Sequence, residues 1–346
     1  MDASSVGAMR VLVLLLALAV PAAAGMKPSF WLDSVAWRSS HIVVATEGDK
    51  IDGKLIVIDC LAGVVKSRSI VELPGLAKFS DERLRVIHES LRATSERVDG
   101  SRMVLFLAEG IGSFKGAAEY GGIEVSTAWI RNEKAYALVQ LINPGPQVMS
   151  EVGTQQSMLA RIELVRSERR KLEAAQAVEA ASARAQAIAL RIRSPVDIAR
   201  GAAVVALGDC GPDAMPVIER LLADSKQSRY HGMLIEQLAR AGGAAAGPRL
   251  TRQLERDVHY WKETGPALSK GWWNGKDTEP KWRAVLQQNY SRTLATLRAL
   301  KKLECREAAP TAKRLADFWR SLPQLHDKSG LDQMTDAAEA VANLAR

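Results

Sequence analysis

Aromatic side chains that could bind a ligand are concentrated between residues 258 and 282. Four of the eight tryptophans fall in this stretch, and glycine and proline recur between them, which predicts a loop inserted into helical sequence. Indole rings offer a large contact area at low entropic cost, so this loop could stack against sugar rings or anchor a partner. The alternative is that the rings pack the insertion onto the rest of the protein. The residues that we expect to bind a ligand or partner are His259, Tyr260, Trp261, Trp272, Trp273 and Trp282.

Carboxylates among these aromatic residues define an alternative function. Glu263, Asp277 and Glu279 could be the acid and base of an enzyme that acts on envelope polysaccharide, with the tryptophans as sugar subsites. The chain has no Gly-x-Ser-x-Gly motif, and Gly110–Gly116 lacks the spacing of a dinucleotide-binding loop. No two histidines are four residues apart and no Cys-x-x-Cys occurs, so we expect no metal site and no cofactor. These observations favour a binding protein over an enzyme.

Residues 1–24 have the composition of a signal peptide. Arg10 precedes an apolar run, Val11–Val20, and Ala22 and Ala24 are the small residues that a signal peptidase requires. The run is shorter than a transmembrane helix, and no later segment is long and apolar enough, so we expect no stable membrane span after cleavage. An uncleaved N-terminal anchor is the alternative. The sequence therefore predicts an exported protein, periplasmic or extracellular.

The overall charge gives an indication of the partner. The formal net charge is +8, which favours anionic partners such as an acidic protein surface or an anionic envelope polymer. Arginines between residues 161 and 171 alternate with glutamates, as on a solvated helix face, and we expect no nucleic-acid binding. Cys60, Cys210 and Cys305 are an odd number, so at least one thiol stays free. Buried free thiols are one interpretation, and a Cys210–Cys305 disulfide is the other.

Residues 25–148 show the periodicity of strands. Residues 41–46 and 55–58 flank a turn-rich link and predict a hairpin, with a third strand at 69–73. Residues 81–98 have helical spacing behind the capping residue Ser80. The unbroken apolar run 103–107 predicts a core strand, and residues 123–130 and 135–142 predict a second hairpin. The expected fold is a small antiparallel β barrel or sandwich with one helix.

Beyond residue 146 we expect helices only. Residues 151–192 predict one long helix or two in near continuity, because this segment is rich in the helix formers Ala, Arg, Glu and Leu. Helix pairs follow at 195–223, 228–257 and, more loosely, 281–304 with 307–321, before a last helix at 331–344. The first two pairs repeat at an offset of 31 and then 32 residues. The matched positions are Leu207, Gly211, Ala214, Pro216, Ile218 and Leu222 with Leu238, Gly243, Ala246, Pro248, Leu250 and Leu254.

The segment Ala206–Ile218, continued by Leu221 and Leu222 and then by Leu238–Leu254, resembles the helix pairs of HEAT-like repeats of the PBS-lyase type. The resemblance implies a right-handed stack of helix pairs with an adaptable concave face that serves binding. It implies no particular chemistry, and residues 260–280 interrupt its period. We therefore predict an α+β multidomain protein that acts as an exported binding protein or scaffold. Its parts are a signal peptide (1–24), a β-rich domain (25–148) and an all-α HEAT-like solenoid (149–346) with the aromatic insertion (258–282).

Overall fold

The computed structural model describes residues 30–47, 53–73, 102–109, 114–116, 119–120, 123–124, 126–140, 147–264, 280–321 and 332–345. The chain divides into two compact units, Met1–Arg166 and Ser167–Arg346.

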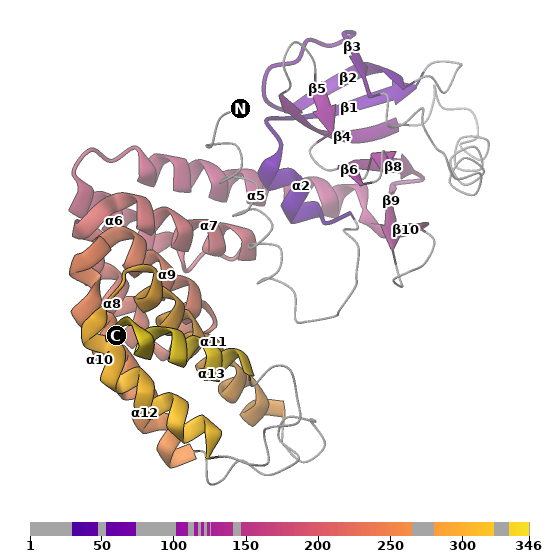
Figure 1. Ribbon diagram of the computed structural model, residues 1–346. Coiled ribbons are helices and arrows are strands. Elements are labelled where there is room, and N and C mark those ends of the chain that lie inside the picture. The colour runs from indigo at the N-terminus through magenta and orange to yellow at the C-terminus, as the bar shows by residue number, and fades with distance from the viewer. Residues whose placement is uncertain are drawn as a thin grey trace, which may run out of the picture. The chain divides into compact units, whose positions relative to one another are not determined.

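The first unit is built on an antiparallel sheet (Figure 1). Its elements are α2 (Leu32–Arg38), β1 (His41–Glu47), β2 (Lys54–Ala62), β3 (Ile70–Glu72), β4 (Arg102–Glu109), β5 (Phe114–Gly116), β6 (Glu119–Tyr120), β7 (Ile123–Glu124), β8 (Thr127–Arg131), β9 (Lys134–Gln140) and β10 (Gln147–Thr154). The strand order is β10-β9-β8-β4-β1-β2-β3, with β5 added to β4 as the eighth strand, while β6 and β7 form a separate pair. Every pairing is antiparallel.

The sheet buries one continuous apolar face. Alternate residues of β2 show the pattern: Leu55 and Val57 are buried, whereas Ile56 and Ile58 between them are exposed. The same core includes side chains from β1, β3, β4 and β8, with Trp129 at 2% exposure. On β4 the intervening residue Phe106 is also fully buried. The central strands are therefore covered on both faces.

Helix α2, which the periodicity did not predict, contributes to the second face. Phe30, just before it, makes an edge-to-face contact with Phe106 at 5.7 Å between ring centroids. Arg161 of α5 (Gln155–Gln176) makes a bidentate ion pair with Asp33, with N–O distances of 2.7 and 2.6 Å. Arg166 Nη1 donates to the carbonyl oxygen of Ser39 at 2.7 Å. These contacts fix the first turns of α5 against α2.

Both predicted hairpins are confirmed. β1 pairs with β2, and β8 pairs with β9 across Asn132 and Glu133, which have φ angles of 47° and 62°. Two consecutive residues with positive φ form the tight turn whose twist matches that of the flanking strands. The predicted third strand and the core strand are present as β3 and β4. The expected helix at 81–98 lies outside the described residues.

Three details of the β-rich part differ from the prediction. A closed barrel is wrong, because the described strands form an open sheet that ends at β3 and β10. The single strand expected at 123–130 is two strands, since β7 pairs with β6 and β8 with β4. Residues 147–154 form β10, where we expected helix from residue 151. Val152, Gly153 and Thr154 are poor helix formers, and this segment pairs with β9 instead. The Thr154 hydroxyl then caps α5 by accepting a hydrogen bond from the Ser157 N–H at 3.1 Å.

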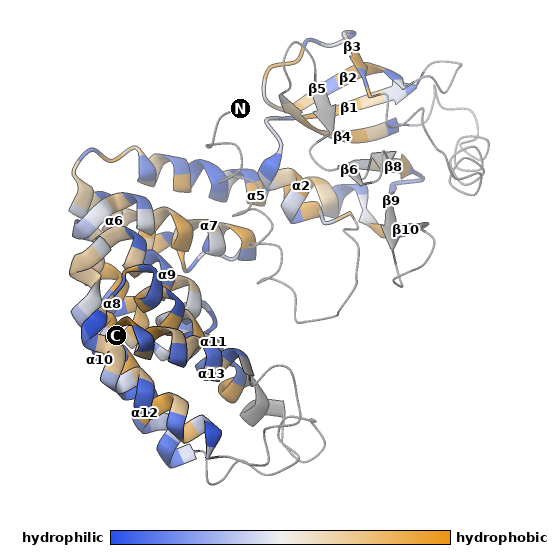
Figure 2. Ribbon diagram, in the orientation of Figure 1, coloured by the Kyte–Doolittle hydropathy of each residue, from blue (hydrophilic) through white to orange (hydrophobic). Residues whose placement is uncertain are grey.

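The second unit is mostly helical (Figure 1). After α5 come α6 (Ala181–Arg191), α7 (Asp197–Leu207), α8 (Met215–Ala223), α9 (His231–Gly242), α10 (Gly247–Thr264), α11 (Pro280–Lys302), α12 (Ala309–Arg320) and α13 (Asp332–Ala342). Apolar and polar residues alternate in stripes along α10 and α12 (Figure 2), as expected of helices with one buried face. Of the two expectations for 151–192, separate helices are correct, with the break at residues 177–180. None of the helices in the described part of the chain combines the length and apolar character that a membrane crossing requires.

The matched positions of the two repeats have matching conformations. Gly211 and Gly243 both have positive φ, 68° and 51°, in the turns before α8 and α10. Three residues later Ala214 and Ala246 are both fully buried. A third copy of this Ala-x-Pro start opens α12 at residues 308–310, and its Ala308 is also fully buried. The spacing of the repeat therefore corresponds to one local structure.

Polar contacts join residues about one repeat apart. Arg229 lies 3.5 Å from Asp197, and Arg240 is paired with Asp209, at sequence separations of 32 and 31 residues. Trp261 Nε1 donates to Thr293 Oγ1 at 2.9 Å, again across 32 residues. The two ion pairs join segments one repeat apart, and the Trp261 hydrogen bond joins α10 to α11. Cys60, Cys210 and Cys305 are all free thiols, so the disulfide interpretation is wrong for this structure.

Candidate binding groove

Helix α10 presents three arginines on one face. Arg249, Arg252 and Arg256 are spaced three and four residues apart, which places them on the same side of a helix. Leu250 and Leu254, the repeat positions, are fully buried on another side of the helix. One helix therefore supplies both a core stripe and a basic stripe.

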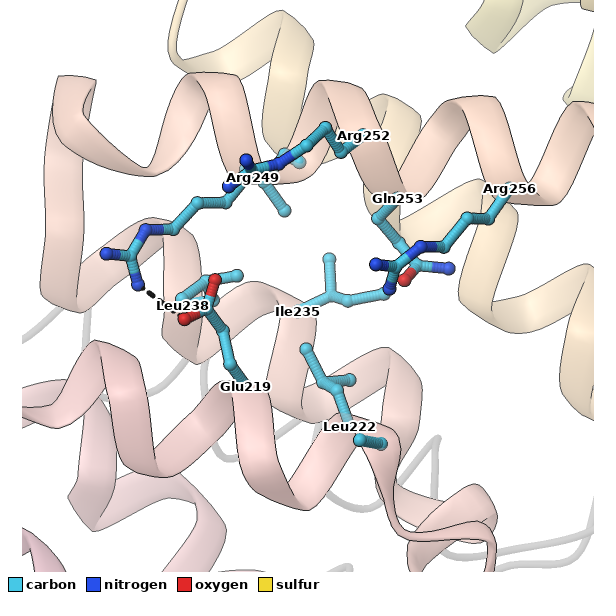
Figure 3. Close-up of a pocket in the computed structure, with 10 residues that line it drawn as sticks. Glu219, Leu222, Ile235, Leu238, Arg249, Arg252, Gln253 and Arg256 are labelled. Carbon is cyan, nitrogen blue, oxygen red and sulfur yellow. Dashed lines mark hydrogen bonds and ion pairs between the residues drawn. The ribbon is translucent and has the colours of Figure 1, made fainter.

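The basic stripe borders a cavity of about 320 Å³ between α8, α9 and α10 (Figure 3). It is lined by Glu219, Leu222, Ala223, Ile235, Leu238, Arg249, Leu250, Arg252, Gln253 and Arg256. All of these residues belong to the second unit. We call this site the α8–α10 groove.

The deep wall of the α8–α10 groove is apolar. Ile235 and Leu250 have no exposed surface, and Leu238 is 2% exposed. Leu222 is half-buried, and Figure 3 shows it on the opposite side of the hollow from Arg252. The groove can therefore accept an aliphatic group beneath a charged rim.

The rim carries excess positive charge. Arg249 Nη1 lies 2.6 Å from Glu219 Oε2, as the dashed line in Figure 3 marks. Glu219 is the one carboxylate among the described residues that line the groove, so the three arginines leave two positive charges in excess. Guanidinium groups bind carboxylates and phosphates with two parallel hydrogen bonds, which gives both strength and orientation. The groove therefore has the chemistry of a site for an anionic group attached to an apolar one.

A buried ion pair joins α10 to α11 beside the groove. Asp257 is fully buried, and its Oδ1 accepts hydrogen bonds from Arg292 Nη2 and Nε of α11 at 2.6 and 2.9 Å. Gln253 Nε2, whose residue lines the groove, donates to the same oxygen at 2.9 Å. Burial raises the pKa of the Asp257 carboxyl, and the charge and hydrogen bonds of Arg292 oppose that rise. The pair fixes the orientation of Gln253 and joins α10 to α11.

The aromatic residues predicted to bind a partner lie in different environments. Trp261 has no exposed surface: it packs against Trp319 at 5.1 Å between centroids and is hydrogen-bonded to Thr293. For Trp261 the geometry favours the packing alternative. Tyr260 is half-buried and contacts Trp261 edge to face. Trp272 and Trp273 lie outside the described residues, and so does the side chain of Trp282 in α11.

The remaining predicted positions form no cluster with the tryptophans in the described part of the chain. His259 Nε2 lies 3.1 Å from Glu263 Oε1, and both side chains are largely exposed on α10. Asp277 and Glu279, the other carboxylates considered for catalysis, lie outside the described residues. Among the residues that the structure describes, no group of three His, Cys, Asp or Glu side chains could hold a metal ion.

The comparisons add no relative to this picture. No protein-family model, no curated protein and no solved structure matches the chain.

The sequence analysis did not identify the three arginines of the groove as binding residues. Their signal was present as the spacing of residues 249, 252 and 256 within a repeat helix. The packing of α8 and α10 against α9 was needed to show that an apolar hollow lies beside them.

Proposed function

We propose that this chain is an exported binding or scaffold protein in which HEAT-like helical repeats hold an anionic partner, with the α8–α10 groove as the contact site. The export part rests on the basic residue, apolar run and small residues of 1–24. Its partner is an acidic protein segment or an anionic envelope polymer.

The repeat part of the proposal is supported by local equivalence. Two turns with a positive-φ glycine, two buried alanines three residues on and ion pairs across 31 and 32 residues are what stacked helix pairs produce. Stacks of this kind serve recognition, because neighbouring helices form extended surfaces that no single helix offers. The family resemblance points in the same direction.

One observation carries the binding part: three arginines border an apolar hollow that contains a single carboxylate. Glu219 is paired with Arg249, and Arg252 and Arg256 are exposed at the rim. Glycosidases use two carboxyl groups on either side of the scissile bond, and the lining of this groove holds one. The groove therefore fits binding better than hydrolysis.

The test is co-purification from the native cell envelope with residues 25–346 as bait. We expect the Arg252→Ala/Arg256→Ala double variant to lose a specific partner that the unaltered chain retains. The matched control is Arg193→Ala/Arg306→Ala, which removes two exposed arginines of the same unit outside the groove. Equal losses in both double variants would show a general charge effect and contradict the proposal.

The aromatic insertion is tested beside the groove with Trp272→Ala/Trp273→Ala. Loss of the same partner would extend the contact site to the insertion. Full retention would leave the groove as the contact site and the tryptophans as packing residues.

A further inference from the structure

We propose that the α8–α10 groove binds an acidic helical peptide segment whose leucine enters the hollow between two glutamates seven residues apart, and that Glu219 competes with one of those glutamates for Arg249. This inference rests on the proposed function and names the chemistry of the partner. The occupant is a polypeptide and not a polysaccharide.

The apolar wall decides between these two classes of polymer. Of the apolar side chains that line the hollow, Leu222 is half-buried and Ala223 is exposed, whereas Ile235, Leu238 and Leu250 are almost completely buried. An anionic polysaccharide has carboxylates or sulfates but no aliphatic side chain, so it would leave the accessible apolar lining, Leu222 and Ala223, in contact with water. A leucine side chain is stabilised by leaving water for contact with such apolar groups. A peptide supplies both the leucine and the acids.

The spacing of the arginines decides the conformation of that peptide. Arg249 and Arg256 are seven residues apart on α10, which at 1.5 Å per residue is about 10.5 Å along the axis. Glutamates at positions i and i+7 of a second helix have the same separation, and a leucine at i+3 or i+4 then lies between them on the same face. Arg252 lies between the two outer arginines and can contact either acid. The groove therefore matches a helix that lies along α10.

Glu219 gives the groove a built-in competitor. Its carboxylate holds Arg249 at 2.6 Å, and its side chain is 40% exposed. A ligand glutamate that reaches Arg249 must replace this contact or share the guanidinium, and it is repelled by the Glu219 charge. Glu219 therefore lowers the affinity for all acidic ligands and selects those with a second anchor at Arg256.

The experiment measures fluorescence anisotropy of a labelled, alanine-based helical peptide with glutamates at i and i+7 and leucine at i+3 and i+4, titrated with residues 25–346. We expect Arg256→Ala to weaken binding about tenfold, the effect of one charge-assisted hydrogen-bonded pair. We expect Glu219→Gln to strengthen it several-fold. Changing the leucines of the peptide to serine, and moving its glutamates to i+2 and i+5, should each weaken binding about tenfold or more.

The outcomes separate this inference from the proposed function. Tighter or equal binding of dextran sulfate, weakened by Arg252→Ala/Arg256→Ala, would overturn the peptide assignment and leave an anionic binding site in place. Equal binding of the peptide with displaced glutamates would overturn the helical register. Binding of peptide and polymer that is unchanged in the arginine variants would overturn both proposals. Circular dichroism of each variant verifies that the helices are intact.

Discussion

The turn before α8 offers a test of the repeat in which one type of substitution has opposite effects at two sites ten residues apart. Gly211 has φ 68° and ψ −162°, a backbone conformation open almost only to glycine. Gly201 lies inside α7 with ordinary helical geometry. A Cβ added at either position meets no atom within 4 Å, so neither substitution creates a steric clash with its surroundings. The difference between them is backbone conformation alone.

The magnitudes follow from the two conformations. At Gly211, alanine must adopt a conformation that costs about 1–3 kcal/mol, while the stiffer unfolded chain returns about 0.4–1 kcal/mol. Gly211→Ala should therefore lower the free energy of unfolding by about 1–2 kcal/mol. At Gly201, alanine improves helix propensity and should raise it by about 0.5–1 kcal/mol. The two variants should differ by roughly 2 kcal/mol.

The assay is thermal and urea unfolding of the full chain followed by circular dichroism at 222 nm, which reports mainly the helices. For a unit of this size, about 1 kcal/mol corresponds to a change in Tm of roughly 2–4 °C. Gly211→Ala should melt several degrees below the parent protein and Gly201→Ala slightly above it. A Gly211→Ala protein as stable as the Gly201→Ala protein would refute the positive-φ turn and, with it, the structural equivalence of Gly211 and Gly243.

Three further predictions concern groups buried in the second unit. Arg292→Ala should lower the free energy of unfolding by about 3–5 kcal/mol in urea titrations, because it leaves the Asp257 carboxylate buried without its charge partner. The double variant Arg292→Ala/Asp257→Asn should recover part of that loss. Trp261→Phe should cost about 1–3 kcal/mol in the same assay, since it removes the donor to Thr293 and opens space beside buried neighbours. Burial lowers the pKa of His231 below its ordinary value of 6.5, so the unfolded chain binds the proton more readily, and stability should fall as the pH drops below about 6.5. His231→Gln should make the denaturation midpoints at pH 7.5 and pH 5.5 more nearly equal than in the parent protein, and an unchanged difference would contradict that assignment.

The elements that the sequence predicted best are those whose signals are local. The hairpin of β8 and β9 follows from two apolar runs and a four-residue link, and the helix pairs from 3.6-residue spacing. Strand β10 was not predicted, because the pairing that makes it a strand is not local in the sequence. Residues 147–154 give a mixed local signal: Val148, Val152 and Thr154 favour a strand, whereas Gln147, Met149 and Glu151 are compatible with a helix. Pairing with β9, from Gln147 opposite Gln140 to Thr154 opposite Lys134, makes them a strand.

The candidate site was harder to predict for a related reason. A cluster of tryptophans suggests a binding site because tryptophan is rare and has a large apolar ring. Trp261 is nevertheless a core residue, and its burial depends on α11 and α12. Arginines are common on helix surfaces, so their presence does not by itself indicate a binding site. What distinguishes Arg249 and Arg256 is the hollow beside them, which exists only after α8, α9 and α10 have packed together.

Comparing equivalent positions of the three Ala-x-Pro helices separates residues that recur from residues found in one helix alone. Buried positions recur: Ile218, Leu250 and Ala312 are buried at matching places in α8, α10 and α12, counted from the Ala-x-Pro start of each helix. Arg252 also has a counterpart in each helix, so its presence follows from the repeat. The residues matching Arg249 are Val217 and Thr311, both buried, and those matching Arg256 are Asp224 and Phe318. Among these three helices, arginine at the two ends of the basic stripe is thus confined to α10. Arg249 pairs with Glu219 of α8, whereas Arg256 is exposed and makes no ion pair within the described residues. Under the proposed function, Arg256 is therefore the residue of the basic stripe that we expect to carry specificity.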